Sequence, residues 1–196
     1  MFFVVTGGSG SGKSAFAEKL TASLGEGRRI YIATMMCFDE EGKKRISRHR
    51  AMRADKHFET LERYTDLCGL EVPEDSILLL ECMSNLVANE MFPPADASGI
   101  QATEAEKEAL DDTENMKDYE NTQIRRVSKK VLKEVSILSE NVAELVIVTN
   151  NVFEDGVSYD ESTMNYIKAM GIVNRGLSAM AERVVEVVAG ISVTVK

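Results

Sequence analysis

The segment that most constrains the fold lies at the start of the chain, where the apolar run FFVV leads into GGSGSGKS and then into the amphipathic stretch SAFAEKL. Residues 7–14 fit the pattern G-x-x-x-x-G-K-[ST], whose glycines let backbone N–H groups approach an oxyanion closely. The pattern therefore predicts a strand, a phosphate-binding loop and a helix in direct succession. Lys13 is expected to reach the β- and γ-phosphates of a nucleotide, and Ser14 to ligate Mg²⁺.

Further short apolar runs recur along the chain, at residues 30–34, 76–81, 144–149 and 184–195. Several lack the alternation of a one-sided strand, which indicates strands buried on both faces of a parallel sheet. Helical periodicity lies between them, as in residues 121–138. This succession predicts an α/β doubly wound sheet. Gly190 divides the last run in two, which predicts an antiparallel hairpin at one edge of the sheet.

Length and composition are typical of one globular domain that spans residues 1–196. The net charge of −9 argues against a nucleic-acid partner, because affinity for the phosphate backbone needs a broad basic surface. The three cysteines show neither C-x-x-C nor Cys/His spacing, so we expect no disulfide framework and no zinc site. No apolar run approaches the roughly 18 residues of a membrane span, and we expect a cytoplasmic protein.

Residues 93–122 do not follow the succession of strands and helices. The segment is polar and acidic, and Lys107 and Lys117 are its only bases. We interpret it as an excursion from the domain, partly disordered or weakly helical. A functional lid is the alternative, because long loops in compact domains often have that role.

A phosphate-binding loop of this kind usually works with an acidic residue near the metal, at the carboxyl end of another buried strand. The run SILLLE ends in such a residue, Glu81. Three roles stay open for it: direct ligand of Mg²⁺, ligand through water, or base for an acceptor hydroxyl. Ser14 and Glu81 are therefore the predicted metal-binding residues, and Lys13 and Glu81 are predicted to be catalytic. The alternative for Glu81 is an exposed carboxylate without function.

The stretch RISRHR, residues 45–50, places a histidine among arginines in an acidic protein. Residues 39–52 are expected to form a helix with an acidic start, in which Arg45, His49 and Arg53 share one face. Neighbouring cations disfavour protonation of the imidazole, so we expect a mostly neutral ring. Such a ring beside cations that bind phosphate suits a general base or a nucleophile at phosphorus. A solvated basic face is the alternative.

Together these motifs resemble a known family, the bifunctional adenosylcobinamide kinases and adenosylcobinamide-phosphate guanylyltransferases of cobalamin biosynthesis. The matching stretches are VTGGSGSGKS, YIAT, RISRHR with TLE shortly after it, ILLLEC, VIVTN and VNRGLSAMAERVVEVVAGISVTVK. Their order and spacing agree over most of the chain outside the acidic excursion. The resemblance implies a P-loop NTPase of the RecA-like α/β type, with a mostly parallel sheet flanked by helices, that assembles as a homotrimer.

The resemblance also implies a two-step enzyme that uses GTP, ATP and Mg²⁺ and a corrinoid substrate. A nucleoside triphosphate first phosphorylates the aminopropanol hydroxyl of adenosylcobinamide. A histidine, whose place His49 takes here, then attacks the α-phosphate of GTP and passes GMP to the corrinoid phosphate. The family's nucleotide-binding positions fall on Gly7, Gly8, Ser9, Gly10, Ser11, Gly12, Lys13, Ser14, Ala33, Thr34, Met35, Arg50, Ala51, Met52, Arg53, Glu62 and Glu81.

The chain departs from the family pattern after VTN, where the family commonly reads E-V-G-x-G-I-V-P. Here the sequence is NVFEDGVSY, with Asn151 in place of the glutamate. The identity of the corrinoid and the retention of both steps therefore stay open. Two other functions also stay open: a P-loop kinase of another small alcohol, in which no guanylylated protein forms, and a nucleotide-dependent switch or assembly ATPase that binds a protein partner.

Overall fold

The computed structural model describes residues 1–36, 56–93, 113–152, 156–157 and 159–196. These residues form a seven-stranded sheet in the order β3-β2-β4-β5-β1-β6-β7, in which only the β6–β7 pair is antiparallel. The strands are β1 (Phe2–Thr6), β2 (Arg29–Ala33), β3 (Glu59–Glu62), β4 (Ile77–Glu81), β5 (Glu144–Val148), β6 (Arg183–Val188) and β7 (Ile191–Thr194). The expected α/β fold, with a mostly parallel sheet and a C-terminal antiparallel edge hairpin, is confirmed.

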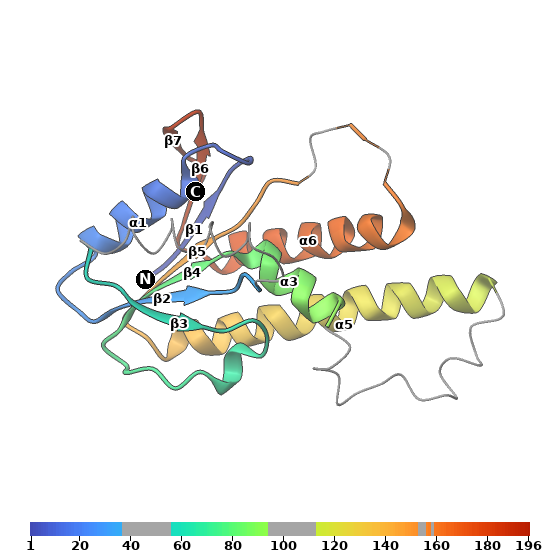
Figure 1. Cartoon of the computed structure of the whole chain (residues 1–196), viewed down its shortest axis with the longest axis horizontal. Helices are drawn as coiled ribbons and strands as arrows, with labels where there is room; N and C mark the ends of the chain where they lie inside the picture. The colour runs from blue at the N-terminus through green and yellow to red at the C-terminus, as the bar shows by residue number, and fades with distance from the viewer. Residues whose placement is uncertain (37–55, 94–112, 153–155, 158) are drawn as a thin grey trace.

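Helices cover both faces of the sheet (Figure 1). On one face lies α1 (Lys13–Ser23), and on the other lie α3 (Met83–Met91), α5 (Thr113–Glu140) and α6 (Glu161–Met180). The central strands are apolar throughout because their side chains point alternately into two cores. In β1, for example, Phe3 and Val5 face α1, whereas Phe2 and Val4 face the three-helix side.

The start of α6 follows directly from the local sequence DEST. The carboxylate of Asp160 accepts hydrogen bonds from the backbone N–H of Thr163 at 3.1 Å and from the hydroxyls of Ser162 and Thr163. These bonds, first those from the Thr163 and Ser162 hydroxyls, hold the pKa of Asp160 well below its usual value. Asp160 is thus a side-chain N-cap that fixes where the helix begins.

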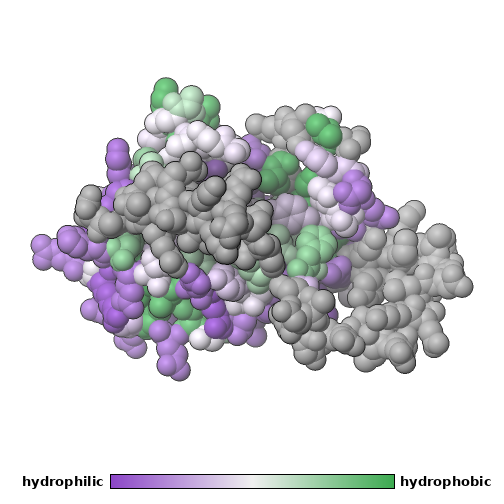
Figure 2. Space-filling view, in the orientation of Figure 1, coloured by the Kyte–Doolittle hydropathy of each residue, from purple (hydrophilic) through white to green (hydrophobic). Residues whose placement is uncertain are grey.

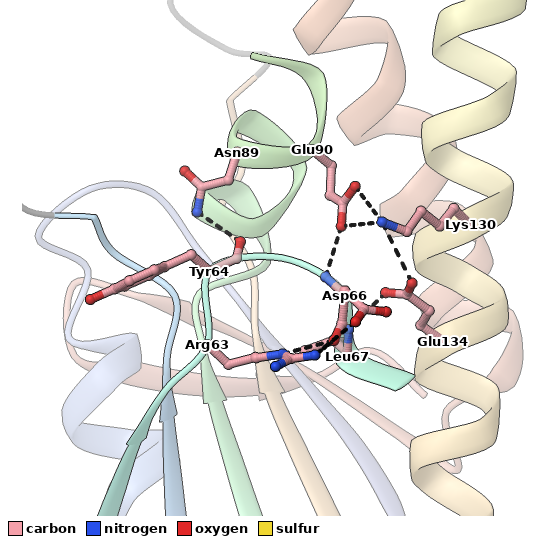
Figure 3. A network of polar contacts seen from close by, with 8 residues as sticks. All are labelled: Arg63, Tyr64, Asp66, Leu67, Asn89, Glu90, Lys130 and Glu134. Atoms are coloured by element: carbon pink, nitrogen blue, oxygen red, sulfur yellow. Dashed lines mark hydrogen bonds and ion pairs between the residues drawn. The ribbon is translucent and has the colours of Figure 1, made fainter. Parts of the chain in front are cut away.

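A polar network holds the chain that follows β3 against the helices (Figure 3). The backbone N–H of Asp66 donates to Glu90 Oε1 at 2.9 Å, and that of Leu67 donates to Glu134 Oε2 at 3.0 Å. Lys130 lies between the two carboxylates, at 2.7 Å from Glu90 and 3.7 Å from Glu134. The network includes the short 3₁₀ helix η2 (Leu67–Gly69), and it anchors a short strand that lies at the edge of the sheet formed by the described residues.

The β6–β7 hairpin carries a row of exposed aliphatic side chains, which forms the green tip at the top of Figure 2. These are Val188, Ile191, Val193 and Val195.

Within the described part of the chain, no helix is long and apolar enough to cross a membrane. The helix expected at residues 39–52 lies outside the described residues. So does most of the acidic excursion, whose last ten residues, 113–122, are the start of α5.

Candidate functional site

The loop of residues 7–12 joins β1 to α1, as the sequence predicts. Gly10 and Gly12 have φ angles of +70° and +90°, a region that glycine enters without strain. Gly8, Ser9 and Gly10 are exposed, so the middle of the loop faces solvent. Lys13 folds back over the loop and its ammonium group donates to the Gly8 carbonyl at 3.0 Å. Burial lowers the pKa of Lys13, while the nearby Cys82 and Glu81 act in the opposite direction.

The phosphate-binding loop is held by the end of the sheet on both sides. The backbone N–H of Gly190, in the β6–β7 turn, donates to the Ser11 carbonyl at 2.8 Å, and the N–H of Asn151 donates to the Gly7 carbonyl at 3.2 Å. Gly7 has no room for a side chain, because an added Cβ would lie 2.5 Å from the Val187 carbonyl oxygen. The loop conformation therefore depends on residues that are distant in sequence.

Glu81 ends β4, and its carboxylate is held by two hydroxyls. The Ser14 hydroxyl donates to Oε1, and the Tyr31 hydroxyl donates to Oε2 at 3.1 Å. In the sheet, β5 lies between β4 and β1. The hydrogen bond between Ser14 and Glu81 therefore spans the carboxyl end of β5. The structure thus brings the predicted residues Lys13, Ser14 and Glu81 into one place.

The site formed by Lys13, Ser14 and Glu81 is suited to a nucleoside phosphate with bound Mg²⁺. A hydroxyl and a carboxylate are the hard oxygen ligands that Mg²⁺ prefers, and Mg²⁺ is usually bound by one or two such groups together with substrate phosphates. Ser11 adds a second observation, since its buried Oγ has no hydrogen-bond partner among the described residues. A phosphate oxygen in the loop would give that hydroxyl an acceptor.

The other predicted nucleotide-binding residues lie farther along the same edge of the sheet. Ala33 and Glu62 are aligned at the carboxyl ends of β2 and β3, and the exposed Glu62 accepts a hydrogen bond from the Tyr64 hydroxyl at 2.7 Å. Because β3 is four strands from β1, Glu62 lies roughly 19 Å from the strand that leads into the phosphate-binding loop at the usual strand spacing. Ala33 is nearer, since it pairs in register with Glu81.

Thr34, also predicted at a nucleotide-binding position, is fully buried. Its hydroxyl donates to the Cys82 carbonyl at 2.8 Å and accepts from the Cys82 N–H at 2.7 Å. The Thr34 carbonyl in turn accepts from Asn89 Nδ2 at 2.9 Å, and the same amide group donates to the Tyr64 carbonyl at 2.9 Å. The Thr34 side chain thus braces the backbone that follows Glu81, while Met35 beside it is half-buried.

Sequence reasoning did not single out a second polar group, at the carboxyl end of β5. Asn150 Nδ2 donates to Ser84 Oγ at 2.5 Å, and the Tyr166 hydroxyl donates to the Ser84 carbonyl at 3.3 Å. Burial, together with the neighbouring Cys82, raises the pKa of Tyr166 to about 12. The signal was present, because Asn150 is a polar residue shortly after a buried apolar run.

His49 and the positions Arg50, Ala51, Met52 and Arg53 lie outside the described residues. The chain re-enters the described structure at Lys56, whose ammonium group forms an ion pair with Glu18 Oε2 on α1. The Glu18 side chain is only 2% exposed. Lys56 therefore joins the start of the described segment 56–93 to the helix that begins at the phosphate-binding loop.

Comparison with known proteins gives consistent matches over the whole chain. The model of a family described as "Cobinamide kinase / cobinamide phosphate guanyltransferase" matches residues 3–195. The chain is 31% identical to the bifunctional adenosylcobalamin biosynthesis protein CobU of Escherichia coli (strain K12) and 30% identical to the protein of that name from Salmonella typhimurium, in each case over 100% of both chains. It is 27% identical to CobP of Pseudomonas aeruginosa, over 98% of this chain and 96% of that protein.

A solved structure described as an ATPase domain has a TM-score of 0.46 to this protein, at 13% sequence identity. The match covers 94% of this chain and 68% of that one.

Proposed function

Because the chain belongs to the cobinamide kinase / cobinamide phosphate guanyltransferase family, and is therefore a transferase of cobalamin biosynthesis, we propose that it performs both transfers that the family description names. The first moves the γ-phosphoryl group of ATP or GTP to the aminopropanol hydroxyl of adenosylcobinamide. The second moves GMP from GTP to the resulting phosphate. The observation that carries the proposal is the hydrogen bond between Ser14 and Glu81 beside the phosphate-binding loop.

In the kinase step, the backbone N–H groups of the loop and Lys13 bind the phosphates, and Ser14 and Glu81 are the residues that would hold Mg²⁺. The bound ion would supply positive charge that offsets the charge on the phosphoryl oxygens. The acceptor oxygen forms a bond to the γ-phosphorus as the bond to the β-phosphate oxygen breaks. The acceptor proton passes to the Glu81 carboxylate, so that the diphosphate leaves with the electron pair of the broken bond.

In the guanylyl step, His49 is the nucleophile. Its neutral ring attacks the α-phosphorus of GTP, and the bond from that phosphorus to the bridging oxygen of the β-phosphate breaks. Pyrophosphate leaves, and GMP stays bound to a ring nitrogen of the histidine. The corrinoid phosphate then attacks the same phosphorus and releases the histidine. The support for this assignment is the sequence RISRHR at the family's histidine position, and the arginines at positions 50 and 53 are suited to binding the triphosphate.

The experiment is intact-protein mass spectrometry after incubation with GTP and Mg²⁺, followed by a radiolabel assay with adenosylcobinamide as acceptor. The native protein should carry an acid-labile, base-stable GMP adduct, and His49→Asn should carry none. His57→Asn is the matched control, because His57 is exposed and asparagine tolerates its φ of +57°. An adduct on His49→Asn, or no label transfer to adenosylcobinamide, would contradict the proposal.

The proposal includes the finer expectations of the family resemblance. The protein acts in the cytoplasm as a homotrimer, and the nucleotide-binding positions at Ala33–Met35, Arg50–Arg53 and Glu62 serve GTP. Sedimentation equilibrium tests the trimer directly, and a dimer or monomer at micromolar concentration would contradict it.

A further inference from the structure

Asn150 lies just beyond the carboxyl end of β5 and has no role in the two transfer steps proposed above. The loop that binds phosphate follows β1, Glu81 ends β4, and β5 is the strand between them. Asn150 is two residues beyond the last residue of β5, Val148. The topology therefore places Asn150 between the phosphate-binding loop and Glu81, at the carboxyl end of a parallel sheet, where ligands of such folds bind.

The backbone around Asn150 is fixed from three sides. The Thr149 N–H donates to the Val5 carbonyl at 2.9 Å, and the Asn151 N–H donates to the Gly7 carbonyl at 3.2 Å, so both flanking residues are tied to β1 and the loop. The Asn150 carbonyl accepts from Asn174 Nδ2 at 3.2 Å. Asn174 is itself oriented by the Thr149 hydroxyl, which donates to its Oδ1 at 2.6 Å. A side chain mounted in this way has a defined direction.

The Asn150 side chain is half-buried and points toward the residues that follow Glu81. Its Nδ2 donates to Ser84 Oγ at 2.5 Å and lies 4.0 Å from Cys82 Sγ. Cys82 is the residue after Glu81, which accepts a hydrogen bond from Ser14 beside the phosphate-binding loop. The amide of Asn150 therefore lies beside the backbone that follows the proposed metal-binding carboxylate.

Ser84 is a neutral acceptor, and a better one would compete with it. A phosphoryl oxygen carries negative charge, and hydrogen bonds to charged acceptors are about twice as strong as those between neutral groups. Ser84 Oγ also contacts Cys82 Sγ at 3.0 Å, so it keeps a partner if the amide turns away. The exchange therefore leaves Ser84 Oγ with a hydrogen-bond partner.

We propose that Asn150 is a catalytic residue whose side-chain amide leaves Ser84 and donates to a γ-phosphoryl oxygen of the bound nucleoside triphosphate. The inference rests on the proposed kinase function for the identity of the triphosphate site, but not on the acceptor. If Asn150 instead had only a structural role, it would hold Ser84 and the β5–α6 connection, and it would act equally on every nucleotide.

The test compares the binding of a non-hydrolysable triphosphate and of the corresponding diphosphate, each with Mg²⁺, by isothermal titration calorimetry. Asn150→Ala should weaken triphosphate binding about tenfold, the value of one hydrogen bond to a charged group, and leave diphosphate binding unchanged. Asn150→Asp, which has nearly the same size, should weaken triphosphate binding further because its carboxylate repels the phosphoryl group. If either Asn150→Ala or Asn150→Asp fails to fold, the other variant still tests the proposal.

Ser84→Ala is the matched control, because it removes the resting partner of the amide and leaves the amide in place. It should bind the triphosphate at least as tightly as the native protein does, because no acceptor then competes for the amide. Equal losses for both nucleotides in Asn150→Ala, or the same triphosphate loss in Ser84→Ala, would overturn the assignment. Asn150 could prove to strengthen triphosphate binding over diphosphate binding in a protein that phosphorylates no corrinoid. In that case the proposed function fails while this inference stands.

Discussion

Ser14 and Glu81 are 67 residues apart in the chain, and a hydrogen bond between their side chains joins the first turn of α1 to the end of β4. Tyr31 on the neighbouring strand β2 occupies the second carboxylate oxygen of Glu81. The carboxylate is therefore oriented before any nucleotide binds. Preorganisation of this kind reduces the reorganisation needed when a metal and a triphosphate enter.

Replacement of Glu81 by glutamine tests this arrangement. The glutamine side chain would keep the size and one acceptor oxygen but lose the charge that holds Mg²⁺ and receives the acceptor proton. We expect the kcat of phosphoryl transfer to fall by about 100-fold or more. Nucleotide binding without Mg²⁺ should not weaken, because the loop that binds phosphate is intact. The measurement is the initial rate against Mg²⁺ concentration, together with nucleotide affinity in a chelator.

Tyr31→Phe is the control for Glu81→Gln, because it removes a neutral donor to the same carboxylate and leaves the charge of Glu81 in place. Its effect on kcat should be about tenfold at most. A Glu81→Gln protein with native kcat, or a Tyr31→Phe protein with the larger loss, would show that the charge of Glu81 is not what the reaction needs.

The second prediction concerns the adjacent residues Gly7 and Gly8, of which Gly7 has no room for a side chain and Gly8 has open space around it. A Cβ on Gly7 would lie 2.5 Å from the Val187 carbonyl and 2.6 Å from Ser11 Oγ, whereas a Cβ on Gly8 would meet nothing within 4 Å. Since the Val187 carbonyl is backbone, the loop or β6 must shift. Gly7→Ala should lower the free energy of unfolding by roughly 1–3 kcal/mol. Urea denaturation should show no comparable loss for Gly8→Ala, and equal losses would contradict the geometry.

Much of the fold was predictable because its central strands are short apolar runs with turn residues around them. Glu81 was predictable for the same reason, since it is the first charged residue after such a run. The edge strand β3 was not predicted, because the four residues ETLE are too few and too polar to give a period. Its place is set by the neighbouring strand β2 and by the network of Figure 3 rather than by its own hydrophobicity.

The strand order was beyond the sequence, and the site depends on it. That β5 lies between β1 and β4 is a non-local fact, and it is what places Asn150 beside the phosphate-binding loop. The contact between Gly190 and Ser11 has the same origin, because it joins two turns almost the whole chain apart. The Thr34 hydroxyl braces Cys82, which no local pattern could have indicated, and the nucleotide-binding role of Thr34 stays a prediction.

Glu134 gives a prediction about pH. Burial raises the pKa of this carboxyl above its ordinary value of 4.5, and the Leu67 N–H and Lys130 only partly offset that effect. A raised pKa in the folded state means that the contribution of Glu134 to stability is fully present below the unfolded value. It is lost as pH rises through the folded value. Ionisation of Glu134 therefore disfavours folding at higher pH.

Glu134→Gln removes this titration while its amide oxygen can still accept from Leu67. Relative to the native protein, the variant should gain stability as pH rises from about 4.5, by up to roughly 1.4 kcal/mol per pH unit within the titration range. Urea denaturation of both proteins at several pH values between about 4.5 and 7.5 measures the difference. A difference that does not change with pH, or that changes in the opposite direction, would show that Glu134 is not destabilised by its burial.

The ion pair between Lys56 and Glu18 gives the last prediction, because its two members are unequally buried. The Glu18 side chain is 2% exposed and that of Lys56 is 29% exposed. Lys56→Met should leave a buried carboxylate without its cation and lower the free energy of unfolding by roughly 3–5 kcal/mol. The double variant Lys56→Met with Glu18→Gln should recover most of that loss, since no charge is then buried alone. Chemical denaturation of the single and double variants completes the cycle, and losses that simply add would mean that the two side chains do not stabilise each other.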